Sequence, residues 1–162
     1  MDRTLLLLRH GHAADPLGVA DVERPLSTAG TAQARRLGAR PGGHRVDRVL
    51  CSPALRTRQT LDAAGVTAPA EFPSGLYLAD PDTVRTLVSE TDETVRTLLV
   101  VGHFPGLPQA AAELDPAGAS AHGLDAGLPP AGLIVLRTAA DWSALAPGEP
   151  LPEIAVTAVR TD

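Results

Sequence analysis

Residues 5–12 of this chain read LLLLRHGH: four consecutive leucines, then an arginine and two histidines on either side of a glycine. Four apolar residues in a row are too few for a helix and are typical of a short strand that is buried on both faces. The polar side chains that follow then lie at the point where this strand ends. The segment therefore predicts a buried strand that leads into Arg9 and His10.

Four further apolar segments predict strands. Residues 46–50 lead directly into Cys51. Residues 98–101 lead through Gly102 into His103, and because they are entirely apolar they favour a central place in the sheet. The remaining two predicted strands are 133–136 and 154–159, of which the last alternates in polarity as an edge strand does.

Helical segments lie between these strands and carry start and stop signals. Apolar strands that alternate with helices predict an α/β fold of three layers, in which helices flank a mostly parallel central sheet. Residues 116–131 are rich in Gly, Ala and Pro and predict a loop, to which the sequence assigns no role. The predicted helices are 28–40 after an N-cap at Ser27, 53–64 with Pro53 in its first position and Gly65 as its stop, one that Asp82 caps and that runs to about Glu90, and 106–114.

The composition limits what the chain can be. Its 162 residues suit one compact domain that spans residues 1–162. All 14 basic residues are arginines, so phosphate chemistry would rest on guanidinium groups and not on a Walker A or Schiff-base lysine. The single cysteine, Cys51, excludes an intramolecular disulfide and a multi-cysteine zinc site. A net charge of −5, with no signal or membrane-spanning segment, predicts a cytoplasmic protein that binds neither nucleic acid nor membrane.

Polar side chains gather at the predicted strand ends. Parallel α/β sheets place their ligands at the carboxyl ends of the strands. Three of the predicted strands end in Arg9 with His10, in the segment 52–56, and in His103. A guanidinium group presents a fork of N–H donors that suits phosphoryl oxygens. The sequence therefore predicts a pocket for a dianion, with an imidazole at its floor.

The other three histidines have weaker claims to a role in the pocket, because a lone histidine is more commonly a surface residue. His44 lies in a Gly-rich turn and His122 in Ala/Gly/Ser sequence, so both are interpreted as surface residues. His12 is next to the predicted pocket, and the sequence leaves open whether it takes part in the chemistry or faces solvent.

Four stretches of sequence resemble motifs of the histidine phosphatase (phosphoglycerate-mutase-like) superfamily. Residues 8–13, LRHGHA, resemble its RHG signature, residues 52–60, SPALRTRQT, its second motif, and residues 100–103, VVGH, its third. Residues 24–30, RPLSTAG, match a segment of the short branch that includes the SixA-type phosphohistidine phosphatases. Three motifs in the family's order, each at a predicted strand end, are far more specific than the RHG tripeptide alone.

The resemblance implies a phosphoglycerate-mutase-like fold and a phosphatase that forms a phosphohistidine intermediate on His10, the nucleophile. The ligands of the phosphoryl oxygens would be Arg9, Arg56 and His103. Neighbouring arginines would lower the pKa of the His10 imidazole and favour its neutral form, which can attack phosphorus. This chemistry requires positioning and charge neutralisation, so we expect no metal and no other cofactor. The residues that the resemblance also places against the substrate are Gly11, Ser52 and Arg24.

The proton donor for the leaving group is where the sequence departs from many larger members. They carry a glutamate between the second and third motifs, whereas residues 74–82 here read SGLYLADPD. Asp80 is the candidate general acid, because Asp82 is more simply the N-cap of a helix. The short branch also lacks the glutamate. That absence fits a phosphohistidine substrate, whose P–N bond breaks readily once solvent or His103 protonates the nitrogen.

A phosphohistidine side chain of a protein is therefore the predicted substrate, since a short chain without a lid leaves an open site. A general phosphomonoesterase for a small phosphorylated metabolite, such as a sugar phosphate or a nucleotide, is one alternative, and Asp80 acting as an acid would favour it. A non-catalytic phosphate- or phosphoprotein-binding module is another, disfavoured because both histidines and both arginines of the motifs are intact. A cysteine phosphatase is excluded, because four residues separate Cys51 from Arg56 where that chemistry needs five.

Overall fold

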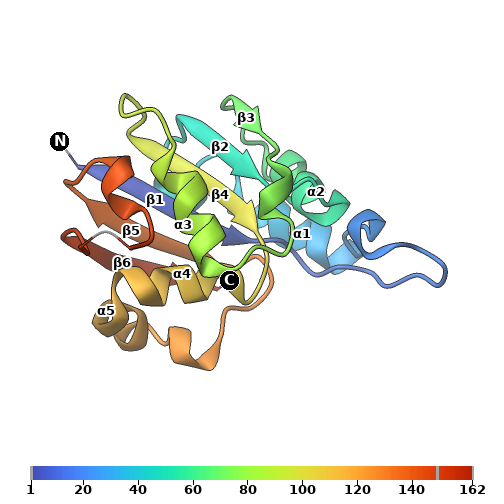
Figure 1. Ribbon diagram of the computed structural model, residues 1–162. Coiled ribbons are helices and arrows are strands. Elements are labelled where there is room, and N and C mark those ends of the chain that lie inside the picture. Colours follow the sequence, from blue (N-terminus) through green and yellow to red (C-terminus); the bar gives the residue numbers. More distant parts are fainter. Residues whose placement is uncertain (1, 149, 162) are drawn as a thin grey trace.

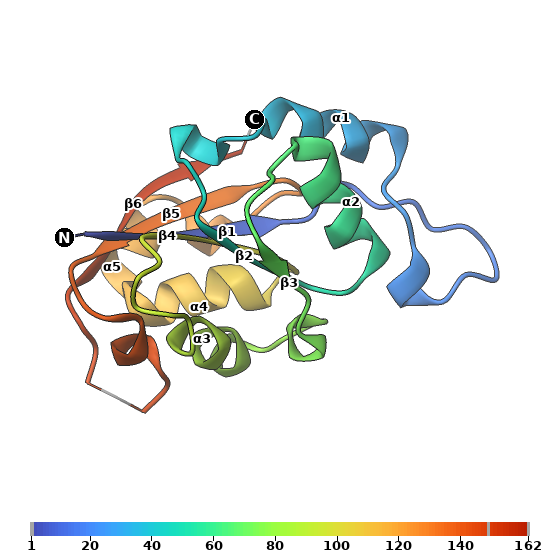
Figure 2. The same cartoon turned by 90° about the horizontal axis from the view of Figure 1, so that it is seen from above.

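The four leucines of residues 5–8 form the middle of strand β1 (Arg3–Arg9), and each is almost completely buried. Leu5 and Leu7 pack into one hydrophobic cluster, whereas the two leucines that alternate with them pack into a second. Successive side chains of a strand point to opposite faces, so β1 needs apolar residues at every position only if both faces are covered. Both faces are covered by helices (Figure 2).

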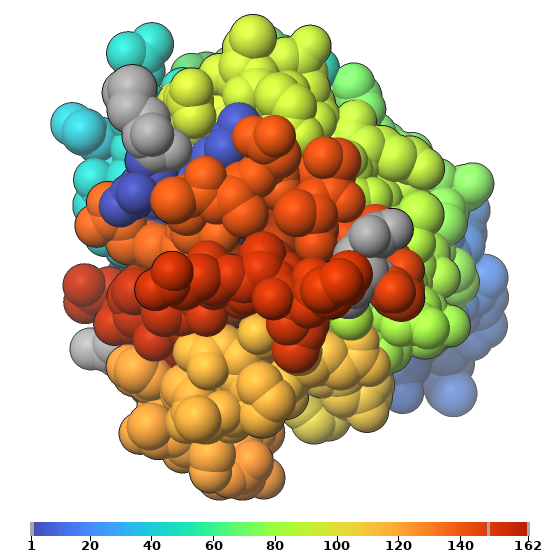
Figure 3. All heavy atoms as spheres, turned by 60° about the vertical axis from the view of Figure 1, so that its left-hand side comes forward, coloured from blue at the N-terminus to red at the C-terminus, as the bar shows by residue number. Residues whose placement is uncertain are grey.

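The computed structural model describes residues 2–148 and 150–161, whose strands form one sheet in the order β3-β2-β4-β1-β5-β6 (Figure 1). The pairs β1–β4, β2–β4 and β2–β3 are parallel, whereas the pairs β1–β5 and β5–β6 are antiparallel. β4 lies at the centre and β6 at an edge, as predicted, and Figure 3 shows β6 (red) as a band along the surface. The other strands are β2 (Arg48–Cys51), β3 (Ala70–Glu71), β4 (Thr97–Gly102), β5 (Leu133–Thr138) and β6 (Ile154–Arg160).

The helices complete the predicted three layers. α1 (Thr28–Leu37) and α2 (Leu55–Ala64) lie on one face of the sheet, and α3 (Pro81–Ser89) and α4 (Gly106–Leu114) lie on the other (Figure 2). The short helix α5 (Pro116–Ala121) follows α4 and buries Ala119 in the same cluster as Leu5. The predicted fold class, a mostly parallel sheet flanked by helices, is confirmed.

Two predicted helix boundaries were wrong. α1 ends at Leu37 and not at residue 40, because Gly38 adopts a positive φ of 71°, which glycine tolerates more easily than other residues. α2 begins at Leu55, because the backbone of Ala54 is still extended, and Pro53 therefore precedes the helix instead of occupying its first position. The predicted stop of α2 at Gly65 is confirmed.

The segment 116–131 is more ordered than the predicted loop. Asp115 caps α5, and a 3₁₀ turn follows at Leu124–Ala126. The segment then runs back to the end of β1, where the N–H of Ala131 donates a hydrogen bond of 2.9 Å to the carbonyl oxygen of His10. The prediction of a plain loop was wrong, since this segment supports the backbone at the end of β1.

The register of the parallel strands brings three strand ends together. Arg9 of β1 pairs with Gly102 of β4, and Cys51 of β2 pairs with Val101 of β4. The carboxyl ends of three neighbouring strands thus lie level at one edge of the sheet. The residues that come directly after these ends are His10, Ser52 and His103.

Candidate active site

A cavity of about 240 Å³ lies at the carboxyl ends of β1 and β4. Arg9 and His10 reach it from the end of β1, Arg56 from the first turn of α2, and His103 from the residue after β4. The structure thus brings together the four side chains that the sequence predicted to meet. The other residues that line the cavity are His12, Ala13, Arg24, Leu78, Phe104 and Pro130.

The ring of His10 is held in one orientation. Its Nδ1 lies 2.6 Å from the carbonyl oxygen of Gly11, and a carbonyl can only accept, so Nδ1 carries the hydrogen. Its Nε2 lies 3.3 Å from Nε of Arg56, which donates to it. The ring nitrogen that carries a lone pair is therefore Nε2.

The surroundings keep His10 neutral. Burial is the main cause that lowers the pKa of His10 to about 4. The hydrogen bond to Gly11 opposes it, and the positive charges of Arg56, Arg9 and Arg24 each lower the pKa further. Near neutral pH the imidazole is therefore unprotonated at Nε2. A neutral imidazole with an oriented lone pair is what nucleophilic attack on phosphorus requires.

His103 is also neutral, and its N–H points away from His10. Its Nδ1 lies 3.4 Å from Nη2 of Arg56, which can only donate, so Nδ1 accepts and Nε2 carries the hydrogen toward the Ser52 hydroxyl at 2.7 Å. Burial, followed by the charge of Arg56, lowers the pKa of His103 to about 3. The rings of His10 and His103 meet edge to face, with centroids 5.4 Å apart.

Both guanidinium groups are fixed by bonds to the backbone. Arg56 is 3% exposed, and its Nη1 donates to the carbonyl oxygen of Asp21 at 2.7 Å. Arg9 donates through Nη1 to the carbonyl oxygen of Leu128 at 2.6 Å, and its guanidinium carbon lies 4.9 Å from the ring centre of Phe104. Two positive charges are thus pre-oriented beside His10, which suits an incoming dianion.

Comparison with known proteins identifies this arrangement. The sequence pattern of the histidine phosphatase superfamily (branch 1) matches residues 5–76. The chain is 40% identical to an uncharacterised protein of Mycobacterium tuberculosis, over 87% of this chain and 93% of that protein. It is 35% identical to the phosphohistidine phosphatase SixA of Escherichia coli, over 69% of this chain and 74% of that protein. The solved structure of a Nakamurella multipartitia protein assigned as a phosphohistidine phosphatase SixA is 33% identical, with a TM-score of 0.85 over 99% of this chain and 96% of that one.

This chain belongs to the histidine phosphatase superfamily. Within it, these similarities place the chain in the SixA-type branch, and the protein is a phosphatase. The family resemblance that the four motifs indicated is confirmed, as is the phosphoglycerate-mutase-like fold.

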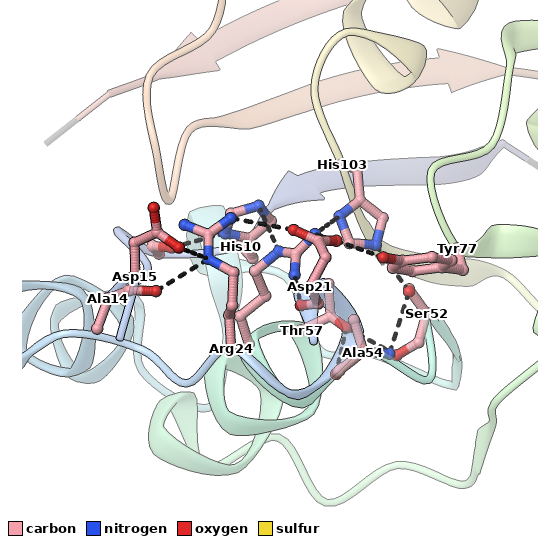
Figure 4. A network of polar contacts seen from close by, with 12 residues as sticks. His10, Ala14, Asp15, Asp21, Arg24, Ser52, Ala54, Thr57, Tyr77 and His103 are labelled. Atoms are coloured by element: carbon pink, nitrogen blue, oxygen red, sulfur yellow. Dashed lines mark hydrogen bonds and ion pairs between the residues drawn. The ribbon is translucent and has the colours of Figure 1, made fainter. Parts of the chain in front are cut away.

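Two residues of this histidine phosphatase site were missed by the sequence analysis. The carboxylate of Asp21 lies 3.1 Å from Nη1 of Arg24 and 3.1 Å from Nη2 of Arg56, and it accepts a hydrogen bond from the hydroxyl of Tyr77 (Figure 4). The hydrogen bond from Tyr77, followed by those from the two arginines, holds the pKa of Asp21 far below its usual range. Tyr77 also places its ring edge-on against His103, with centroids 5.6 Å apart.

Only weak signals pointed to this pair. Asp21 stands three residues before Arg24, within the segment between β1 and α1 that projects from the body of the molecule (Figure 1). Tyr77 lies within residues 74–82, the segment that lacks the glutamate of many larger members. Arg24, a predicted substrate-binding residue, does line the cavity, and it is held there by Asp21, by Asp15 at 3.4 Å and by the carbonyl oxygen of Ala14 at 3.0 Å.

Ser52 and Gly11 lie in the phosphatase site, but their contacts differ from those predicted. Ser52 is fully buried and is absent from the cavity lining, because its hydroxyl is engaged with the ring of His103. A Cβ atom on Gly11 would come within 2.7 Å of the carbonyl oxygen of Gly30, so this glycine permits close packing against α1. Both residues support the site from behind, and that they contact substrate stays a prediction.

Asp80 caps α3, the role that the sequence assigned to Asp82. Its carboxylate accepts a hydrogen bond of 2.8 Å from the N–H of Thr83, because Pro81 takes the first position of the helix. That backbone hydrogen bond lowers the pKa of Asp80. Asp80 does not line the cavity, and a carboxylate held in its ionised form is a poor proton donor. The structure therefore argues against the predicted general acid.

Cys51 does not have the surroundings of a reactive thiol. Cys51 is buried, and burial raises the pKa of its thiol to about 12, so it is not a thiolate nucleophile at neutral pH. Among residues 2–148 and 150–161, no three His, Cys, Asp or Glu side chains are grouped as metal ligands would be. No helix in these ranges is long and apolar enough to cross a bilayer.

Proposed function

We propose that this phosphatase transfers a phosphoryl group to His10 and then to water, and that its substrate is a phosphohistidine side chain of a protein. The observation that carries the proposal is the neutral imidazole of His10, whose Nε2 lone pair lies among the side chains of Arg9, Arg56 and His103. A binding module needs donors for phosphate but has no need of an oriented lone pair among them.

In the first step, Nε2 of His10 attacks phosphorus in line with the bond to the leaving group. Arg9 and Arg56 neutralise the charge that is spread over the phosphoryl oxygens, and such donors are each worth about 3–4 kcal/mol of barrier. In the second step, water attacks the phosphohistidine from the side that the leaving group has vacated. The hydrogen bond from Nδ1 of His10 to Gly11 keeps the ring in place throughout.

Two observations favour a protein as the substrate. Leu78 and Phe104, which line the cavity, are 56% and 44% exposed, so part of the surface at the cavity is apolar. Leu17, on the projecting segment between β1 and α1, is fully exposed as well. Exposed apolar side chains beside a catalytic cavity are typical of a surface that contacts a partner. The 35% identity to the phosphohistidine phosphatase SixA of Escherichia coli favours phosphohistidine as the group recognised.

The test measures phosphate release from a phosphohistidine-bearing protein and from a panel of sugar phosphates and nucleotides. We expect turnover mainly of the phosphohistidine protein, its loss in His10→Ala, and an acid-labile phosphoryl label on the wild-type enzyme alone. His122→Ala is the matched control, since His122 is exposed and lies outside the cavity. Turnover mainly of the small esters would show that the proposed substrate is wrong, while the proposed mechanism through His10 would still stand. Phosphate binding without turnover of any of them would favour a binding module.

A further inference from the structure

The third histidine of the cavity, His12, has an uncommitted ring nitrogen. Its Nδ1 lies 2.8 Å from Oγ of Ser27, the N-cap of α1. The Ser27 hydroxyl donates its hydrogen to the carbonyl oxygen of His12 at 3.1 Å, so Oγ must accept from Nδ1. In the part of the chain that the structure describes, no group hydrogen-bonds to Nε2 of His12. The ring is exposed, anchored at one nitrogen and open at the other.

The other acid–base groups near the cavity are committed elsewhere. His103 directs its N–H to Ser52, and its pKa of about 3 leaves it without a second proton at neutral pH. Asp21 is ionised and bound by two arginines and a tyrosine. Asp80 caps α3 outside the cavity. Of the groups that line the cavity, His12 alone combines exposure to solvent with a ring nitrogen that can take up and release a proton.

We propose that His12 is the general acid that protonates the leaving group, in the role for which the sequence analysis considered Asp80. The proposal rests on the two-step mechanism above, but it does not depend on phosphohistidine being the substrate. The α1 N-cap holds the imidazole by Nδ1 while Nε2 exchanges the proton. The residue is thus positioned by secondary structure, as precise proton transfer requires.

The proton balance closes over the two steps. As Nε2 of His10 forms its bond to phosphorus, the bond from phosphorus to the leaving atom breaks, its electron pair stays on that atom, and Nε2–H of protonated His12 supplies the proton. In the second step, neutral His12 takes a proton from the attacking water, whose oxygen forms the new bond to phosphorus. The P–N bond breaks and its electron pair returns to Nε2 of His10. His12 ends protonated, as it began.

The test compares two esters whose leaving groups differ in their need for a proton. 2,4-Dinitrophenolate leaves unaided, whereas phenolate, which is far more basic, gains from an acid. We expect His12→Gln to lower kcat/KM for phenyl phosphate by about 10²-fold or more, with a far smaller loss for 2,4-dinitrophenyl phosphate. His122→Gln, a matched exchange of an exposed histidine outside the cavity, should change neither value.

Two further measurements separate proton transfer from a structural role. His12→Gln should bind tungstate as the wild type does, since the side chains placed around the oxyanion are Arg9, Arg56 and His103. In His12→Ala, added imidazole should restore turnover of phenyl phosphate. Equal losses for the two esters, no loss for phenyl phosphate, no rescue by imidazole, or a wild type that hydrolyses neither ester would each overturn the proposal. A wild type that hydrolyses the esters but no phosphohistidine protein would remove the proposed substrate and leave the test of His12 intact.

Discussion

Strand β1 carries an arginine at each end, and the positive charges of these two arginines are compensated differently. Arg3, at the amino end, is 5% exposed and pairs with the carboxylates of Glu93 at 3.1 Å and Asp141 at 3.0 Å. Arg9, at the carboxyl end, pairs with no carboxylate of the described chain, and a backbone carbonyl holds it instead. One end of the strand is electrically balanced, whereas the other keeps positive charge available. Of the two ends of β1, the carboxyl end is therefore the one that can bind an anion.

Arg56 lies between these two extremes. Its side chain is as buried as that of Arg3, but it shares a single half-exposed carboxylate, Asp21, with Arg24. Its remaining neighbours are two imidazoles that burial keeps neutral. The same residue type thus has its charge compensated at one end of β1 and left available at the other, where we propose that it serves the phosphatase reaction.

The largest effect is expected from Arg9→Met, which removes uncompensated charge from the cavity. Activity should fall about 10²- to 10³-fold, because a donor to the phosphoryl oxygens is lost. The free energy of unfolding should change little, since Arg9 makes one hydrogen bond to a carbonyl and no ion pair within the described residues. Steady-state kinetics and urea unfolding measure the two quantities. An unfolded variant, or one with nearly full activity, would contradict the contrast between the two ends.

As the pH falls, the groups at the carboxyl end of β1 should lose their contribution to the free energy of unfolding before those at the amino end. The folded-state pKa values of His10, about 4, and His103, about 3, are depressed, so the unfolded chain binds more protons below its ordinary histidine pKa of about 6.5. The stability that these neutral rings contribute is present above about pH 6.5 and is lost as the pH falls toward 4. Urea unfolding across this range should show a shallower decline in His103→Gln. A decline as steep as in the wild type would mean that His103 is not held neutral.

The groups at the amino end of β1 should lose their contribution to the free energy of unfolding only at lower pH. Hydrogen bonds from Ser143 and Trp142, together with the charge of Arg3, outweigh burial and lower the pKa of Glu93. Its contribution is present above the ordinary glutamate pKa of about 4.3 and is lost as the pH falls below it. In Glu93→Gln the change in pH dependence should therefore lie below the window in which His103→Gln acts.

Arg3→Met is the matched counterpart of Arg9→Met and should show the opposite pattern. The free energy of unfolding should fall by about 2 kcal/mol, because charge-assisted bonds to Glu93, Asp141 and the carbonyl oxygen of Ala140 are lost. The activity per folded molecule should stay at the wild-type level, since this end of β1 lies outside the cavity. A selective loss of kcat in a stably folded Arg3→Met would show that the two ends are coupled.

The sequence predicted the fold well, because its strongest signals were local. Unbroken apolar runs marked β1 and β4, and each led to a motif histidine, so the edge of the sheet that carries the site followed from the parallel arrangement. The errors fell where a neighbouring residue decides between two similar conformations. Pro81 makes Asp80 the N-cap instead of Asp82, and the extended Ala54 keeps Pro53 out of α2.

The site was predicted only as far as its motifs extend. Asp21 and Tyr77 are 56 residues apart in sequence and meet because the segment after β1 folds back over α2 and the turn before α3. Ser52 and Gly11 were found by the motifs, but the motif cannot tell whether a side chain faces the substrate or another part of the protein. Contacts that depend on how loops return to the sheet leave no periodic signal in the sequence.

The smallest effect on the site is expected from Asp21→Asn. This change removes the one carboxylate beside Arg56, so that the charge of Arg56 is left uncompensated, as that of Arg9 is. The backbone carbonyl of residue 21 would still hold Nη1 of Arg56, so the guanidinium should keep its place while losing the opposing charge. Exposed ion pairs are worth about 0.2–1 kcal/mol, so tungstate should bind up to about fivefold more tightly. The gain should shrink as salt is added, because Asp21 is half-exposed and its charge is screened. Titrations of wild type and variant at low and high salt measure both effects.

Weaker binding of tungstate at every salt concentration would show that Asp21 acts mainly by orienting Arg56. Orientation would then outweigh charge at this end of β1.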